Sequence, residues 1–344
     1  MSTSPSFERF DYLLRTNKHI ERKLVFDVLY SASQVIDFSE HWYLGLGSMW
    51  FGDFRLAHRL LGIDRLVSIE HSDHAPRAEY NRPFAGVRVE AGECGEVLQR
   101  FSTADWSKPV VAWLDYDGHL STDIVSDIDT LVTRAQPNSA IIITVNGARG
   151  TYRVRRAGGI TARADTSVGV VESFLGATSI PARFQPQQNG AGAYGDVSET
   201  EFPEFLTEAM TTFMQHRVVS SARQEGENRL RFVPLYRLHH RDGADMVTVG
   251  GALVSGAEAS PWERCLANHP ILRDSEDKTA YTRLDLVPVT VKEKIALDAC
   301  LPDPSANEQY IALARETGLK LGEEEIRKYR KFYRHFPVFV ESSM

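Results

Sequence analysis

Residues 231–254 read RFVPLYRLHH, RDGAD and MVTVGGALV, and this stretch predicts a β-hairpin. Two extended apolar runs flank a short turn that contains Asp-Gly, which is a strong short-range hairpin signal. The two strands of such a hairpin run antiparallel. The stretch therefore predicts that the sheet of this protein ends in an antiparallel pair.

Five short apolar runs come before this hairpin, and each is followed by a helix-like stretch. They cover residues 41–47, 65–70, 86–92, 110–118 and 139–147. Strands that alternate with helices predict a parallel sheet covered on both faces. Together with the hairpin, they predict an α/β fold: a Rossmann-like, mostly parallel sheet of seven strands with an antiparallel last hairpin.

The segments on either side of the sheet predict three parts. Residues 1–40 form an N-terminal helical segment, because apolar residues in it recur at spacings of three and four. Residues 41–258 form the main domain, with a Gly- and Arg-rich insert at about 148–200. Residues 259–344 read as a small helical appendage.

Composition limits the classes of protein that the chain can belong to. The 344 residues carry a formal net charge of −7, which argues against a general nucleic-acid binder. No long apolar run or signal core occurs, so we expect neither membrane insertion nor secretion. Three scattered cysteines form no disulfide framework and no CxxC pattern, and together these features predict a cytoplasmic protein.

A glycine-rich turn follows the first predicted strand and precedes a helix. It contains Gly45, Gly47, Ser48 and Gly52, which let the backbone approach a ligand at a helix N-terminus. Glu70 ends the second strand 18 positions after Gly52, close to the spacing expected for a ribose-binding acid. The alternatives are a tight strand-to-helix turn and a solvated acid at the end of a strand.

The end of the fourth predicted strand is rich in groups that could carry chemistry. Asp115, Asp117 and His119 lie where open α/β sheets bind ligands, and each is a candidate catalytic residue. Tyr116 and, at the end of the fifth strand, Asn146 are candidate substrate contacts. The alternative is structural: Asp115 caps backbone N–H groups, and Asp117 begins an Asx-type turn.

Basic residues cluster in two places after the sheet edge. Arg149 and Arg153 open the arginine-rich stretch 149–163, which suits an acidic substrate or a nucleic-acid or protein partner. The stretch 327–336, RKYRKFYRHF, interleaves basic and aromatic residues, as nucleic-acid binders do. A solvated loop and an ordinary helical packing stripe are the respective alternatives.

From about residue 40 to 255, the order of strands, the glycine turn and Glu70 resemble the class I S-adenosylmethionine-dependent methyltransferases. In that family the last strand inserts antiparallel beside the sixth. The resemblance implies that the turn and Glu70 bind S-adenosylmethionine, that Glu93 lies near its adenine ring, and that Asp115 lies beside its methionine end and the methyl acceptor. It also implies that Lys18 or Arg22 of the leading segment can reach the methionine carboxylate, although surface ion pairs would explain both residues equally well.

Asp115 and Asn146 together also resemble part of the site of metal-dependent O-methyltransferases. Val145 occupies the position before Asn146, where those enzymes carry a second acid. We therefore expect no bound metal.

The sequence supports a leading function and two alternatives. The leading hypothesis is a methyltransferase that acts on an unidentified, anionic acceptor, oxygen- or nitrogen-directed. The alternative is a non-catalytic subunit of the same fold that binds nucleic acid or a partner protein, because the glycine spacing departs from the usual GxGxG. A nicotinamide-dependent oxidoreductase is disfavoured, because the GxGxxG spacing is absent and the antiparallel ending would be unexplained.

Overall fold

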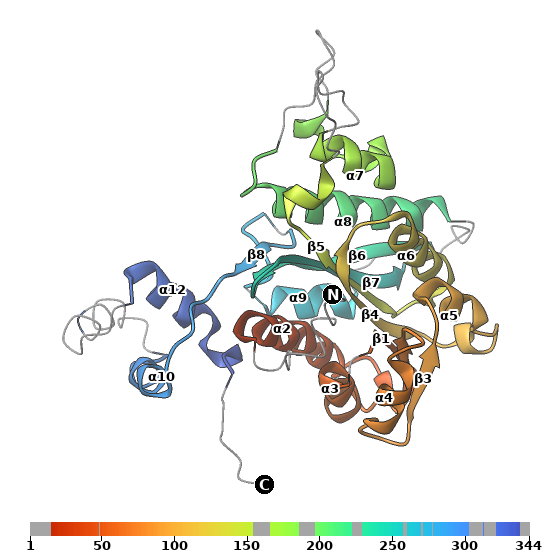
Figure 1. Ribbon diagram of the computed structural model, residues 1–344, viewed down its shortest axis with the longest axis horizontal. Helices are drawn as coiled ribbons and strands as arrows, with labels where there is room; N and C mark the ends of the chain where they lie inside the picture. The colour runs from red at the N-terminus through yellow and green to blue at the C-terminus, as the bar shows by residue number, and fades with distance from the viewer. Residues whose placement is uncertain are drawn as a thin grey trace.

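A central eight-stranded sheet organises the computed structural model (Figure 1). The structure describes residues 15–47, 49–153, 166–185, 197–221, 229–256, 260–269, 271–276, 278–302, 312 and 321–337. The order of the strands is β3-β2-β1-β4-β5-β7-β6-β8. The strands are β1 Trp42–Leu46, β2 Arg65–Glu70, β3 Val87–Ala91, β4 Val110–His119, β5 Ala140–Asn146, β6 Leu230–Arg241, β7 Asp245–Ser255 and β8 Tyr281–Leu284.

The pairing of the strands confirms the predicted α/β sheet. Strands β1 to β5 pair parallel to one another. Strand β7 lies antiparallel between β5 and β6, and β6 and β7 form the hairpin predicted from residues 231–254. The prediction of seven strands is one short, because β8 pairs parallel to β6 at the edge of the sheet.

Helices cover both faces of this sheet (Figure 1). Their bounds are α2 Thr16–Ala32, α3 Gly52–Leu61, α4 Ala75–Tyr80, α5 Cys94–Arg100, α6 Thr122–Arg134, α7 Ser167–Leu175, α8 Phe202–Ser220, α9 Pro261–Ala267, α10 Val291–Asp298 and α12 Glu323–Phe332. Short 3-10 helices cover Phe38–Glu40, Asp105–Ser107, Arg149–Tyr152, Ala177–Ser179, Ala182–Phe184 and Tyr333–His335. None of the helices described is long and apolar enough to cross a membrane.

Alternation along the strands builds a core on each face of the sheet. On β4, Ala112 and Leu114 pack with α5, α6 and α8, whereas Val111 and Trp113 pack with α2, α3 and α9. Successive side chains of a strand point to opposite faces, so an almost continuous apolar run is what a strand covered on both sides requires. This burial fixes the register of the sheet and, with it, the positions of the residues at its carboxyl edge.

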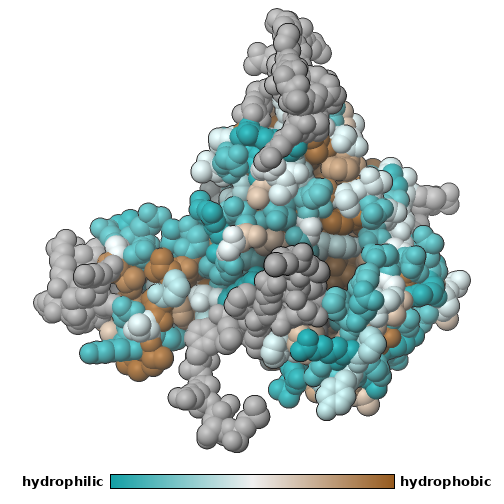
Figure 2. Space-filling view, in the orientation of Figure 1, coloured by the Kyte–Doolittle hydropathy of each residue, from teal (hydrophilic) through white to brown (hydrophobic). Residues whose placement is uncertain are grey.

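The C-terminal part of the chain packs against α2. Leu284, Leu297, Ile326 and Phe332 form a small core with Ile20 and Leu24 of α2. The lobe of α10 and α12 projects from the body of the molecule, and Figure 2 shows hydrophobic colour gathered on it. Residues 259–344, predicted as a small helical appendage, include β8, and α9 among them packs against α2 and β6.

Candidate active site at the carboxyl edge of the sheet

Gly47 and Glu70, the two halves of the predicted cofactor pattern, touch each other. A Cβ atom on Gly47 would lie 1.9 Å from Ser68 Oγ and 2.0 Å from Glu70 Oε1. The Gly47 amide also donates to the Ile69 carbonyl at 3.0 Å, which extends the pairing of β1 with β2. Only glycine therefore leaves room for the Glu70 carboxylate against the backbone of this turn.

The other residues of the glycine turn have different surroundings. A Cβ on Gly45 would meet the Phe54 ring at 3.0 Å, so this glycine allows close packing of α3 on β1. Gly52 is the first residue of α3, after Phe51, whose left-handed φ of 50° is rare for a bulky residue. Ser48 lies outside the described residues. The assignment of this turn to cofactor binding stays a prediction.

Glu70 is a buried carboxylate that has no cationic partner in the described part of the chain. Its relative exposure is 5%, and the Ser68 hydroxyl donates to it across 3.4 Å. Burial raises the pKa of Glu70 to about 7, and the negative charge of Asp53 adds to this effect. A buried acid that lacks a protein cation is suited to hydrogen-bond donors of a ligand.

Arg22 and Asp53 lie near enough to each other, close to the glycine turn, for their charges to interact. Asp53, in the first turn of α3, accepts a 2.5 Å hydrogen bond from the Tyr43 hydroxyl. Burial raises the pKa of Asp53, and the positive charge of Arg22 opposes this rise. Arg22 is only 8% exposed, yet its Nε and Nη1 atoms have no hydrogen-bond partner among the described residues. Arg22 thus offers buried donors where α2 passes the carboxyl edge.

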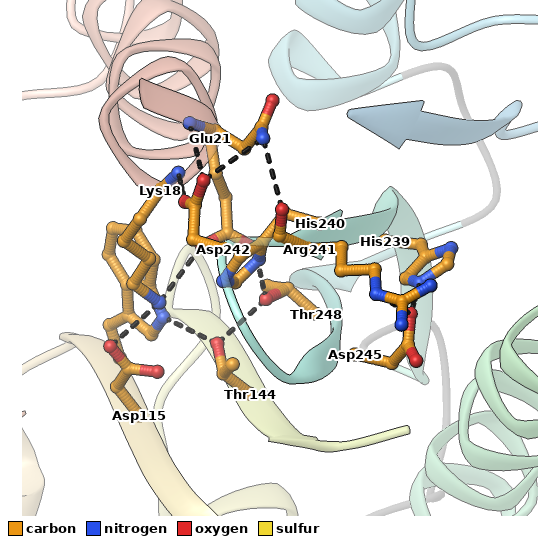
Figure 3. Close-up of polar contacts among 12 residues, drawn as sticks. Lys18, Glu21, Asp115, Thr144, His239, His240, Arg241, Asp242, Asp245 and Thr248 are labelled. Atoms are coloured by element: carbon orange, nitrogen blue, oxygen red, sulfur yellow. Dashed lines mark hydrogen bonds and ion pairs between the residues drawn. The ribbon is translucent and has the colours of Figure 1, made fainter. Parts of the chain in front are cut away.

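Asp115 forms an ion pair with a buried lysine of α2. Figure 3 shows Lys18 reaching towards β4, and its Nζ lies 2.7 Å from Asp115 Oδ2 and 2.9 Å from Glu21 Oε2. Burial alone would lower the pKa of Lys18, but the two carboxylates raise it above its usual value. The ammonium also lies 5.2 Å from the centre of the Trp113 ring. Lys18 is therefore a charged, buried residue rather than one of a surface pair.

A chain of buried hydrogen bonds continues from Glu21 into the sheet (Figure 3). Glu21 accepts a 2.5 Å hydrogen bond from Thr248 Oγ1, which lies 2.7 Å from Thr144 Oγ1. The indole of Trp113 donates to Thr144 at 3.0 Å. Glu21 also contacts His240 Nδ1 at 3.2 Å. This chain connects α2 to β4, β5, β6 and β7 at one depth of the sheet.

The hairpin turn between β6 and β7 closes a cavity of about 240 Å³ at this edge. Asp242 in the turn accepts hydrogen bonds from the backbone amides of Asn17 at 3.3 Å and Lys18 at 2.7 Å, and so holds the start of α2. The lining residues are Arg15, Lys18, Asp115, Asp117, His240, Asp242, Gly243, Ala244 and Met246. Of the three predicted catalytic residues, Asp115 and Asp117 line this cavity and His119 does not.

The end of β4 separates its predicted site residues. The register of β4 on β5 shifts between Asp115 and His119, which moves the residues between them out of the regular ladder. The Tyr116 hydroxyl donates to Asp127 of α6 at 2.7 Å, and burial raises the pKa of Tyr116 above its usual value. His119 is exposed and packs edge-on to the Tyr152 ring. Tyr116, predicted as a substrate contact, therefore interacts with α6.

The remaining predicted residues make contacts of their own. Glu93 is exposed and lies 4.0 Å from His71 Nε2. The side-chain oxygen of Asn146 accepts the Ala148 amide at 2.9 Å. Arg149 is 8% exposed and donates to Ser167 Oγ at 3.2 Å and to Glu199 at 3.3 Å. These contacts tie the start of the insert to the body of the protein, and a role in binding stays a prediction for each residue.

Arg153 is more exposed than Arg149. Arg153 is 45% exposed at its side chain and lies 3.9 Å from Glu199. Residues 154–165 lie outside the described part of the chain. Within the residues described, no three His, Cys, Asp or Glu side chains are grouped so that they could hold a metal ion.

The basic and aromatic stretch near the C-terminus packs through its rings. Tyr329, Phe332 and Phe336 are all less than 4% exposed. They belong to the small core on α2, as the packing-stripe alternative predicts. These three rings are consequently not available to stack on bases, and a nucleic-acid partner of this stretch remains a prediction.

Two kinds of residue in this site escape prediction from the sequence. Glu21 and His240 are separated by 219 positions, and only the packing of α2 on the hairpin brings them together. Asp242 is part of the hairpin signal, but nothing in the turn sequence indicates that it holds α2. A usable signal is the place of His240 one position before the end of β6, a strand whose carboxyl end lies at the same edge as those of β1 to β5.

The fold and the site together define a Rossmann-like α/β protein with a candidate ligand site at the carboxyl edge of its sheet. A family model described as "Putative O-methyltransferase" matches residues 10–344. The chain belongs to this family, and the prediction of a methyltransferase is confirmed. A comparison with curated protein sequences found no match.

Solved structures show more distant similarities. Trm1 from Pyrococcus horikoshii, in complex with S-adenosyl-L-methionine, is 9% identical with a TM-score of 0.43, over 92% of this chain and 76% of that one. A putative S-adenosylmethionine-dependent methyltransferase from Listeria monocytogenes is 11% identical with a TM-score of 0.32, over 69% and 100%. A single-residue variant of LepI, in complex with SAH and a substrate analogue, is 11% identical with a TM-score of 0.33, over 65% of this chain and 46% of LepI. Because these three TM-scores are below 0.5, the assignment of the chain to its family rests on the match to the family model.

Proposed function

We propose that this protein uses S-adenosylmethionine to methylate a hydroxyl group in the cavity beside Asp115. The observation that carries the proposal is the contact between Gly47 and the buried Glu70 carboxylate. A carboxylate at the end of the second strand, against a glycine turn, can accept hydrogen bonds from both hydroxyls of a ribose. The description of the family as O-methyltransferases supports the choice of oxygen as the acceptor atom.

The residues present suit S-adenosylmethionine in two further respects. Arg22 has buried guanidinium atoms without a partner in the described chain, and these would bind the methionine carboxylate. Asp53 lies beside Arg22 and would meet the adjacent ammonium group. The bound donor supplies a methyl group already activated as a sulfonium. The work of the protein is then to align the acceptor and to remove its proton.

The acceptor itself is defined only by the cavity. Its charged lining residues are the carboxylates of Asp115, Asp117 and Asp242 and the cations of Arg15 and Lys18. This lining adds no support to the predicted anionic acceptor, which then depends on the arginine-rich stretch 149–163. The Glu93 contact with adenine and the non-catalytic alternative have no observation in their favour beyond those made on the sequence.

Calorimetry with S-adenosylmethionine tests the proposal directly. The wild-type protein should bind it, and Glu70→Ala should weaken binding tenfold to a hundredfold, because hydrogen bonds to a charged group contribute about 1.5–3 kcal/mol. Asp64→Ala is the matched control, because Asp64 is an exposed acid just before the other end of β2. A wild-type protein that fails to bind S-adenosylmethionine would refute the proposal.

A further inference from the structure

Two adjacent histidines of β6 lie in opposite surroundings. His239 uses both ring nitrogens: Nε2 lies 3.0 Å from Asp245 Oδ1, and Nδ1 lies 2.9 Å from the Tyr281 hydroxyl. His240 is 4% exposed, lines the cavity beside Asp115, and contacts Glu21 through Nδ1. Neighbouring residues of a strand face opposite sides of the sheet, which explains the difference. Of the two rings, only that of His240 lies at the candidate site.

The Glu21 carboxylate behind His240 is held in its ionised form. Burial would raise the pKa of Glu21, but the Lys18 ammonium and the hydrogen bonds from His240 and Thr248 lower it below its usual value. A buried carboxylate accepts a hydrogen bond from a histidine that is protonated at the nitrogen facing it. Glu21 thus favours the neutral tautomer of His240 that carries its proton on Nδ1. In this tautomer Nε2 is unprotonated and can accept a proton.

Asp115 is less suited to removing a proton from an acceptor in the same cavity. Its Oδ2 atom lies 2.7 Å from the Lys18 ammonium, so this oxygen is already held in an ion pair and faces the lysine. The charged groups around His240 are Glu21 and Lys18 of α2, Arg15 just before α2, Asp115 and Asp117 of β4, and Asp242 of the hairpin turn.

We propose that His240 takes the proton of the acceptor hydroxyl through Nε2 and that Glu21 is the positioning residue that orients it. In this step the oxygen–hydrogen bond breaks and the proton bonds to Nε2. The oxygen electron pair forms the bond to the methyl carbon, and the electrons of the carbon–sulfur bond remain on sulfur. Water then takes the proton from the imidazolium. The inference rests on the proposed function, because it concerns the same cavity.

The tautomer of His240 is a test that requires no acceptor. Nitrogen NMR of the full chain, labelled with ¹⁵N-histidine and assigned by comparison with His240→Gln, distinguishes the two neutral tautomers. We expect the His240 proton on Nδ1 and an unprotonated Nε2 at pH 8. A His240 proton on Nε2 would overturn the proposal, because that nitrogen could then accept no proton.

Kinetics with labelled S-adenosylmethionine separate this inference from the proposed function. With the hydroxyl compound that the wild-type protein methylates fastest among catechol, phenol and ethanol, His240→Gln should lower kcat about a hundredfold. Its Kd for S-adenosylmethionine should stay within about twofold of the wild-type value, whereas His239→Gln should keep wild-type kcat. If His240→Gln binds S-adenosylmethionine normally and keeps the wild-type kcat, this inference alone is refuted. If the wild-type protein does not bind S-adenosylmethionine, the proposed function is refuted.

Discussion

Lys18 and Asp115 form an ion pair of 2.7 Å that joins the N-terminal helix α2 to the carboxyl end of β4. The Lys18 ammonium is almost fully buried, and Glu21 lies on its other side at 2.9 Å. Asp115 keeps about a third of its side chain exposed in the cavity. The pair therefore links the stability of the fold to the geometry of the candidate site.

Replacing Lys18 by methionine should lower the stability of the protein by about 3 kcal/mol, because it leaves the fully buried Glu21 carboxylate and the partly buried Asp115 carboxylate without their shared cation. Urea unfolding at pH 7 measures the change. Lys278→Met is the matched control, because Lys278 pairs with Glu276 on the surface and should contribute nothing measurable. Equal stability of the two variants would show that the buried pair does not stabilise the fold.

Gly47→Ala should abolish binding of S-adenosylmethionine, because the added methyl group would lie 2.0 Å from Glu70 Oε1 and 1.9 Å from Ser68 Oγ. Moving these side chains should also cost about 1–3 kcal/mol of stability. Calorimetry and urea unfolding give the two readouts. Gly118→Ala is the control, since a Cβ there meets nothing within 4 Å. Wild-type affinity in Gly47→Ala would place the cofactor elsewhere.

The main sheet could be predicted from the sequence because each of its strands carries a local signal. The five apolar runs end in turn residues, and the Asp-Gly turn indicates the antiparallel hairpin. Strand β8 could not be predicted in the same way, because its four residues, Tyr281–Leu284, contain two polar ones and depend on β6 for pairing. Helix α7 was also missed, since it is a short helix inside a Gly- and Arg-rich insert.

The candidate site likewise contains contacts that the sequence predicts and contacts that it does not. Gly47 and Glu70 lie at the ends of neighbouring strands, so the order of the strands was enough to bring them together. The contacts of Lys18 with Asp115 and of Glu21 with His240 depend on how α2 packs across the sheet. The periodicity of residues within α2 does not indicate that Lys18 pairs with Asp115 or Glu21 with His240. Long-range packing of polar groups therefore limits what the sequence can predict about this site.

Binding of S-adenosylmethionine should strengthen as the pH rises from 6 to 8. The pKa of Glu70 is about 7 because of burial, and its ionised form accepts hydrogen bonds from a ribose better than its protonated form does. Affinity should therefore rise through pH 7 and level off above it, by up to about tenfold per pH unit below the pKa. Calorimetry at three pH values measures this change. Glu70→Gln should bind weakly, with no such dependence.

The same group gives an opposite prediction for the stability of the free protein. The pKa of Glu70 is higher in the folded state than the ordinary value of 4.5, so its contribution to stability falls as the pH rises from 4.5 through 7. Glu70→Gln should therefore stabilise the free protein at pH 8, by at most about 3 kcal/mol, and leave it unchanged at pH 4.5. Urea unfolding at both pH values measures this. A variant that is destabilised at pH 8 would contradict the raised pKa.

Arg149 and Arg153, both predicted to contact the substrate, should respond differently to replacement by methionine. Arg149 is buried against Ser167 and Glu199, so Arg149→Met should lower stability by about 1–3 kcal/mol through the partners it leaves unpaired. Arg153 is nearly half exposed, so Arg153→Met should leave stability within about 0.5 kcal/mol of the wild-type value.

If Arg153 contacts an anionic acceptor, its replacement should raise the acceptor KM with an unchanged kcat. Urea unfolding and steady-state kinetics together separate the anchoring role from the binding role, and full stability of Arg149→Met would remove the anchoring role.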